Sequence, residues 1–159
     1  MVIDSDLRRA LLHEAGHAVA YYLLQHRSAG IAALKEDLVF CNIVGPHSPE
    51  RAVAAGSAAE VLILGDYDAS GAGRDQKDLA ISEAEYGELV KSSVSLLSPY
   101  KHQMRRIQSR LLDSIRWRET LDDFPSIVGP VGGLQPPQDG NTYSLIMSFE
   151  EISAAMTQQ

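Results

Sequence analysis

The sequence is poor in cysteine, and this excludes a disulfide framework. Its only cysteine, Cys41, lies in the apolar run 38–44, where we expect a small buried side chain rather than a reactive thiol. No run approaches the roughly 18 apolar residues that a membrane-spanning helix needs. The first six residues lack the basic start and the apolar stretch of a signal peptide. We therefore expect a soluble, cytoplasmic protein with no membrane span.

Basic residues are also in the minority, because 14 Lys and Arg face 21 Asp and Glu, and the formal net charge is −7. Nucleic acids and anionic membranes are bound by basic surfaces, so neither is expected as a partner. The densest basic cluster, Arg105, Arg106 and Arg110, is interpreted as the solvated face of a helix. The sequence has no G-x-x-x-x-G-K-[S/T] phosphate loop, and we expect no ATP binding.

What the chain does have is a clear helical pattern. With 159 residues, 45% of them hydrophobic, it is long enough for one domain with a substantial core. We predict a mainly α fold with a small β-sheet: a domain over 1–122, a Pro/Gly-rich loop over 123–142, and a short strand with a C-terminal helix over 143–159 that packs on the same domain. The expected helices are 4–27, 50–64, one that begins near residue 75 and one that begins at 98. The expected strands lie in 31–44 and 143–147, a loop covers 66–73, and Ser148 with Glu151 forms a capping box.

The first predicted helix contains the sequence His13-Glu-Ala-Gly-His17, an H-E-x-x-H motif. Two histidines four residues apart lie about 40° apart around a helix and one turn along it, so both imidazoles can reach one metal ion. Glu14 lies next to the first of them and can act as the general base toward a metal-bound water. The alternative is a pair of ordinary histidines, but two imidazoles and a carboxylate are costly to bury without a shared partner.

The third protein ligand of a catalytic zinc is not fixed by spacing. Five carboxylates are candidates, namely Glu60, Asp66, Asp68, Asp75 and Asp78. Asp75 can alternatively be the N-cap of the third predicted helix. The remaining histidines are isolated and are interpreted as surface residues: His26, His47 and His102.

Three segments in order resemble the peptidase domain of the FtsH family: residues 13–19 (HEAGHAV), 56–65 (GSAAEVLILG) and 70–75 (SGAGRD). The resemblance covers roughly residues 4–122 and implies an FtsH-like zincin fold. It implies that His13, His17 and Asp75 bind Zn²⁺ and that Glu14 is the catalytic base. It leaves Asp78 and Glu60 as alternative third ligands, and it places Glu60 where a carboxylate can support a ligand from behind or simply face solvent.

The chain departs from this family in several ways. It lacks the ATPase module and the transmembrane helices, and the stretch between the first and second helices is shorter. That stretch contains the strand expected to bind the backbone of a substrate. Ser57 replaces an arginine, Gly73-Arg74 replace Ser-Asn, and the segment after Phe124 has no counterpart.

From these observations we expect a stand-alone, ATP-independent zinc metalloendopeptidase that cleaves unfolded or flexible polypeptides. The alternative is a zinc-binding, peptidase-like module with weak or lost activity that serves as an adaptor or partner protein. Two imidazoles and a carboxylate also suit other divalent metals, including iron. The resemblance leaves assembly into a homo-oligomer open, because FtsH peptidase domains form rings.

Overall fold

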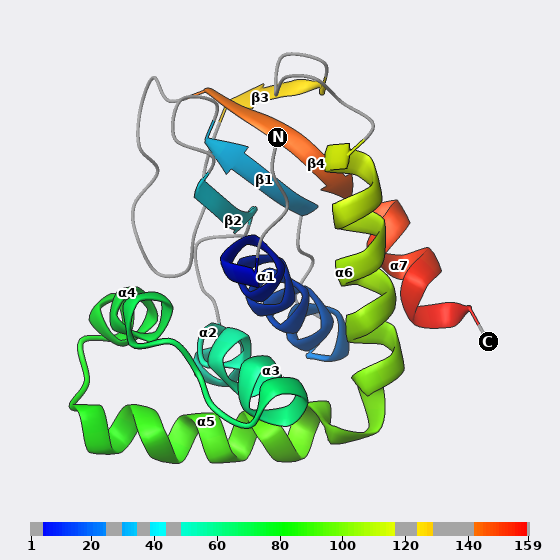
Figure 1. Ribbon diagram of the computed structural model, residues 1–159. Helices are drawn as coiled ribbons and strands as arrows, with labels where there is room; N and C mark the ends of the chain where they lie inside the picture. Colours follow the sequence, from blue (N-terminus) through cyan, green and yellow to red (C-terminus); the bar gives the residue numbers. More distant parts are fainter. Residues whose placement is uncertain are drawn as a thin grey trace.

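A long helix, α1 (Ser5–Leu23), lies at the centre of the computed structural model, with a sheet on one side and helices on the other (Figure 1). The structure describes residues 5–24, 30–34, 39–43, 49–116, 124–128 and 142–158. Its elements confirm the predicted fold class of a mainly helical chain with a small antiparallel sheet. None of the described helices is long and apolar enough to cross a membrane.

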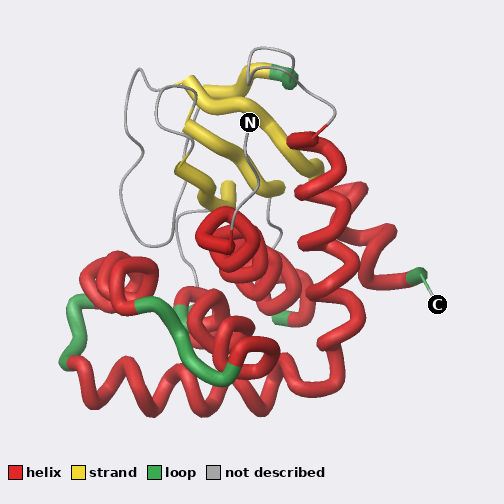
Figure 2. The backbone as a smooth tube through the Cα atoms, viewed as in Figure 1, coloured by secondary structure: helices red, strands yellow, loops and turns green. Residues whose placement is uncertain are grey.

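The four strands are antiparallel and lie in the order β2-β1-β4-β3 (Figure 2). They are β1 (Gly30–Leu34), β2 (Val39–Ile43), β3 (Ser126–Val128) and β4 (Thr142–Ser148). Strand β4 pairs with both β1 and β3, so the C-terminal segment supplies an inner strand. A two-stranded hairpin alone is marginally stable. The pairing with β4 therefore supports the β1–β2 pair, whose second strand also contacts α1.

Helices cover the remaining faces of α1. They are α2 (Glu50–Val53), α3 (Ala55–Leu64), α4 (Ala69–Leu79), α5 (Glu83–Leu97), the 3₁₀ turn η1 (Ser98–Tyr100), α6 (Lys101–Arg116) and α7 (Phe149–Thr157). The most extensive helix contacts of α1 are with α3 and α6, and α7 lies beside α6 and also contacts α1 and the sheet (Figure 1). Residues 11–21 of α1 are all buried, which makes this helix the centre of the core.

Small residues bring α1 and α3 unusually close together. A Cβ added to Gly16 would lie 2.5 Å from the Ala55 carbonyl oxygen and 2.6 Å from Ala59 Cβ. Any larger side chain at these positions would push the helices apart. In the sequence, the alanines of α3 indicate only a good helix former. In the structure they also set the short distance between α1 and α3.

Several predicted boundaries were wrong. The predicted helix 50–64 is two helices that meet at Ala54, and the predicted helix from residue 75 is α4 followed by α5. The break between α4 and α5 is at Ala80, which adopts a left-handed conformation with φ of 55°, and Ser82 then caps α5. Alanine carries no sequence signal for this conformation. Ala80 and Ala84 are exposed, while Tyr86 and Val90 of α5 are buried.

The loop expected over 66–73 was also wrong in its second half, because α4 begins at Ala69 and includes Gly71 and Gly73. Strand β3 lies within the range 123–142 that we predicted as loop. The predicted start of the helix at 98, the strand over 143–147 and the Ser148 capping box are confirmed. His26 and His47 lie outside the described residues, as does most of the Pro/Gly-rich segment.

Candidate metal centre

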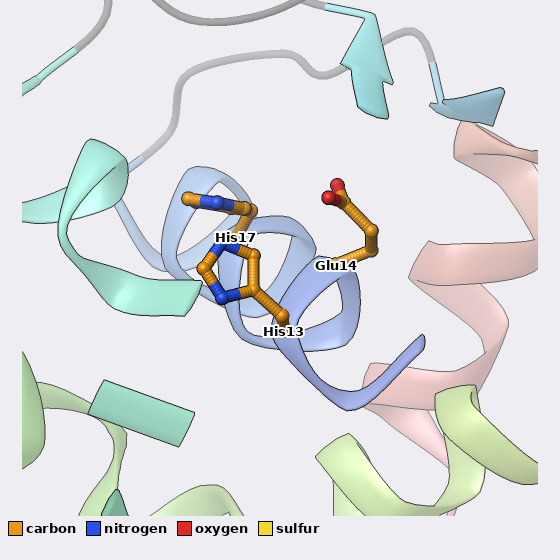
Figure 3. Close-up of side chains that lie close together, drawn as sticks. All are labelled: His13, Glu14 and His17. Atoms are coloured by element: carbon orange, nitrogen blue, oxygen red, sulfur yellow. The ribbon is translucent and has the colours of Figure 1, made fainter. Parts of the chain in front are cut away.

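The H-E-x-x-H motif lies on α1 in its fully buried part. His13, Glu14 and His17 each offer a ligand atom, and these atoms all lie within 4.8 Å of one another (Figure 3). The two imidazole rings meet edge to face, with centroids 4.7 Å apart. The three residues are only 7–8% exposed. This buried group can hold a metal ion, as the spacing on the helix predicts.

Asp75 comes to the same place from α4. Its Oδ2 lies 3.0 Å from His13 Nε2 and 3.4 Å from His17 Nε2, so one oxygen faces both imidazoles. Asp75 is not the N-cap of its helix. Asp68 has that role, since its Oδ1 accepts a hydrogen bond from the Ser70 N–H. Asp75 is therefore in the second turn of α4, on the buried side.

The far nitrogen of each imidazole has its own partner. His17 Nδ1 donates to the Ala52 carbonyl oxygen at 2.8 Å, and this bond leaves Nε2 to face Asp75. His13 Nδ1 lies 3.1 Å from Glu60 Oε2. Metal-binding histidines commonly donate their second N–H to a carbonyl or carboxylate, which fixes the ring and its tautomer. Both histidines therefore have the surroundings of ligands that bind through Nε2.

Glu60 in turn contacts a cation. It is 1% exposed, and its Oε1 accepts a hydrogen bond from Arg9 Nη1 at 3.2 Å. Arg9 lies four residues before His13 on α1, and its Nη2 also binds Asp66 Oδ1 at 3.0 Å. The buried carboxylate is thus held between an imidazole and a guanidinium.

Two glycines line the His13 ring. A Cβ added to Gly56 would lie 2.4 Å from His13 Nε2, and one added to Gly71 would lie 3.4 Å from His13 Cε1. The first distance is too short for any real contact, so Gly56 leaves the space that the ring occupies. Beside it on α3, the Ser57 hydroxyl forms a 2.6 Å hydrogen bond with the buried Tyr86 hydroxyl.

These contacts shift the pKa values of the polar groups. Burial by itself lowers the pKa of His13, but its hydrogen bonds to Asp75 and Glu60 raise that pKa to about 10. Burial also lowers the pKa of His17, but the charge of Asp75, its hydrogen bond to the ring and the charge of Glu14 together raise that pKa. Burial raises the pKa of Asp75, yet the two imidazoles hold it below its usual range. Without metal, His13 therefore holds a proton near neutral pH that a cation would displace.

The donor set and its spacing fit a divalent metal. Ligands at about 2.0–2.1 Å from a tetrahedral ion lie roughly 3.3–3.4 Å from one another. The distances from Asp75 Oδ2 to the two Nε2 atoms, 3.0 and 3.4 Å, are close to that value. Two imidazoles and a carboxylate are a donor set used by zinc, and also by iron(II).

The other candidate ligands have different partners or places. Glu60 binds the far nitrogen of His13, Asp66 binds Arg9, and Asp68 caps α4. Asp78 is one turn beyond Asp75 on the same helix. His102 is exposed on α6, as expected. Among these carboxylates, Asp75 is the one that faces both Nε2 atoms.

Sequence reasoning missed three contributors to the centre. Arg9 was detectable, because it lies at i−4 from His13 on the face that carries the motif. Gly56 begins the segment 56–65 that resembles the FtsH family, but we did not predict that it leaves space for the His13 ring. The Ala52 carbonyl could not have been found, because any residue supplies one.

A scan against protein-family models found no matching family. A search of curated proteins likewise gave no significant match.

Proposed function

We propose that this chain is a zinc-dependent endopeptidase domain of the FtsH-like zincin type. One observation carries the proposal: Asp75 Oδ2 lies 3.0 and 3.4 Å from the Nε2 atoms of His13 and His17, and the Glu14 carboxylate lies in the same cluster. A general base beside three ligands and an open position is the arrangement with which zinc peptidases hydrolyse peptide bonds.

In this proposal each residue has one task. His13, His17 and Asp75 hold the ion, which when bound supplies a Lewis acid that lowers the pKa of water and polarises a carbonyl group. Glu14 accepts a proton from the attacking water and passes it to the leaving amine. The Ala52 carbonyl and Glu60 orient the two rings from behind.

The substrate class follows from what the domain must accommodate. The reacting groups are 7–8% exposed, so a folded protein surface has little access to them. These 159 residues contain no phosphate-binding loop that could drive ATP-dependent unfolding. We therefore assign unfolded or flexible polypeptide segments as substrates.

The proposal is tested by Glu14→Gln in the zinc-loaded protein, with Glu150→Gln on α7 as a matched control. Loss of the general base should reduce hydrolysis of an unfolded, casein-like substrate by about 10²–10⁴-fold while zinc content stays unchanged. The control should cleave like the wild type, since Glu150 is exposed and lies on a different element. Equal cleavage by Glu14→Gln and wild type would contradict the assignment.

The depth of the cluster also supports a second candidate, a metal-holding module that binds a partner protein without cleaving it. The three motif residues are only 7–8% exposed, which leaves a polypeptide substrate little access to them. In this case the wild type and Glu14→Gln would both bind zinc and neither would cleave. Chelation would still lower the melting temperature, because a ligand of the folded state stabilises it.

A further inference from the structure

Arg9 connects the three elements that hold the candidate metal centre. It extends from α1, where the two histidines lie, to Glu60 on α3 and to Asp66 in the connection before α4. Its side chain is 28% exposed, whereas that of Glu60 is 2% exposed. The guanidinium therefore lies at the edge of the buried cluster and reaches into it.

The two oxygens of Glu60 have separate partners. Oε1 faces Arg9 Nη1 at 3.2 Å and the Asp68 N–H at 3.5 Å, while Oε2 faces His13 Nδ1 at 3.1 Å. A carboxylate held at one oxygen cannot rotate freely about its last torsion. The contact with Arg9 thus fixes the direction from which Oε2 accepts the N–H of His13.

Arg9 also fixes the connection that leads into α4. Its guanidinium binds the Asp66 side chain at 3.0 Å and the Asp66 backbone carbonyl at 3.4 Å. Two residues later, Asp68 caps the helix that carries Asp75. A planar guanidinium can make these contacts together because its N–H groups point in fixed directions.

We propose that Arg9 is a positioning residue of the metal centre, which orients Glu60 so that His13 presents Nε2 to the ion. The guanidinium of Arg9 donates its hydrogen bonds to Glu60 and Asp66, so it acts through Glu60 and the start of α4. The inference rests on the metal centre of the proposed function, and it does not depend on peptide hydrolysis.

The experiment compares Arg9→Met with Arg8→Met, which makes the same change of charge at an exposed neighbour on α1. Zinc affinity is measured by competition with a chromophoric chelator. The Nδ1–H of His13 is followed by ¹⁵N NMR in the zinc-loaded protein. Arg9→Met should bind zinc about 10–100-fold more weakly and should shift or lose the His13 Nδ1–H signal. Arg8→Met should behave as the wild type in both measurements.

Two further variants separate positioning from general stability. Arg9→Lys should restore part of the affinity, because an ammonium group carries the charge but lacks the planar fork. Asp66→Asn keeps the oxygen that accepts from Arg9 but removes its negative charge, and since the Asp66 side chain is 77% exposed, the fold should persist even if Arg9→Met does not fold. It should weaken zinc binding less than Arg9→Met and perturb the same NMR signal.

The possible failures are distinguishable. If the wild type binds no zinc, the metal centre and the proposed function both fail. If the wild type binds zinc while Arg9→Met and Asp66→Asn keep its affinity within about twofold and an unchanged His13 signal, the role of Arg9 alone is overturned. Equal losses in Arg9→Met and Arg8→Met would overturn it as well, because they would indicate a nonspecific effect of charge.

Discussion

The two sides of α1 are built in opposite ways. Toward α3 and α4, buried polar groups pair with one another: His13 with Glu60 and Asp75, and His17 with the Ala52 carbonyl. Toward the sheet, α6 and α7, the core is made of aliphatic side chains such as Ile107, Leu111, Met147 and Ile152. On the first side glycine and alanine set the distances, and on the second side larger side chains fill the space.

Several polar contacts between α6 and α7 lie at the edge of the second side, at the end of α7. Arg106 Nη1 donates to the carbonyl oxygens of Ala155 and Gln158 at 2.7 and 2.8 Å, and Arg110 contacts Gln158. A cation at a helix C-terminus satisfies carbonyls that have no partner within the helix. Thus part of the basic cluster that we expected to be a solvated face holds α7 in place. The polar side thus carries the candidate metal centre, while aliphatic packing on the other side makes up most of the apolar core.

The largest expected effect on stability comes from the apolar side. Ile152→Ala on α7 removes a side chain that is 0% exposed, and it should lower the free energy of unfolding by about 2–5 kcal/mol. Urea unfolding of the zinc-loaded protein measures this change. Zinc content should stay at the wild-type level, because Ile152 is on the side away from the cluster. A loss of zinc in the folded variant would contradict the separation of the two sides.

On the polar side, a single methyl group should be enough to disrupt the site. Gly56→Ala places a Cβ 2.4 Å from His13 Nε2, so the ring must leave its position. We expect zinc affinity to fall by at least about a hundredfold, equivalent to about 2.7 kcal/mol.

Gly73→Ala is the matched control, because an added Cβ there meets nothing within 4 Å. It should leave zinc binding unchanged and stabilise α4 by about 0.5–1 kcal/mol, since alanine is the better helix former. The two variants differ only in which glycine gains the methyl group. Equal zinc affinities in a titration of both would contradict the close fit around His13.

The same side should respond to pH in opposite directions with and without metal. The pKa of His13 is raised from 6.5 to about 10 in the folded, metal-free protein. Its contribution to stability is therefore fully present below pH 6.5 and lost as the pH rises through about 10. Zinc requires the deprotonated ring, so zinc affinity should rise over the same window.

Urea unfolding with a chelator present and zinc titrations at several pH values measure these two trends. His13→Asn should flatten the decrease of stability with pH in the chelated protein. A wild-type chelated protein whose stability does not fall in this window would contradict the charge state assigned to the cluster.

The smallest effect is expected at the edge of the apolar side. Arg106→Ala removes two hydrogen bonds to the last carbonyls of α7 and should cost about 1 kcal/mol, since the guanidinium is partly exposed. Arg105→Ala, at an exposed neighbour, should change stability by less than about 0.5 kcal/mol. Thermal unfolding of the two variants tests this difference. Equal melting temperatures would show that Arg106 does not hold α7 in place.

The sequence predicted the parts of the molecule whose signals are local. The position of α1 follows from apolar periodicity, and the closeness of His13 and His17 follows from helical spacing alone. The capping box at Ser148 was likewise readable from two residues.

Long-range arrangements were not readable in this way. The position of β4 beside β1 depends on pairing across more than a hundred residues, for example Gly30 with Ser148. Helix α4 was missed at its start because Gly71 and Gly73 are poor helix formers, and tertiary packing beside His13 outweighs that preference. The resemblance to a known family, rather than spacing, pointed to Asp75, and the structure places it 3.0 Å from His13 Nε2.

Metal content of the purified protein tests the central claim most directly. Elemental analysis should find about one zinc per chain in the wild type and a sharp loss in Asp75→Ala, whose missing carboxylate faces both imidazoles. Full zinc content in Asp75→Ala would remove this residue from the ligand set. A wild type that binds no metal even when zinc is supplied would contradict the metal centre itself.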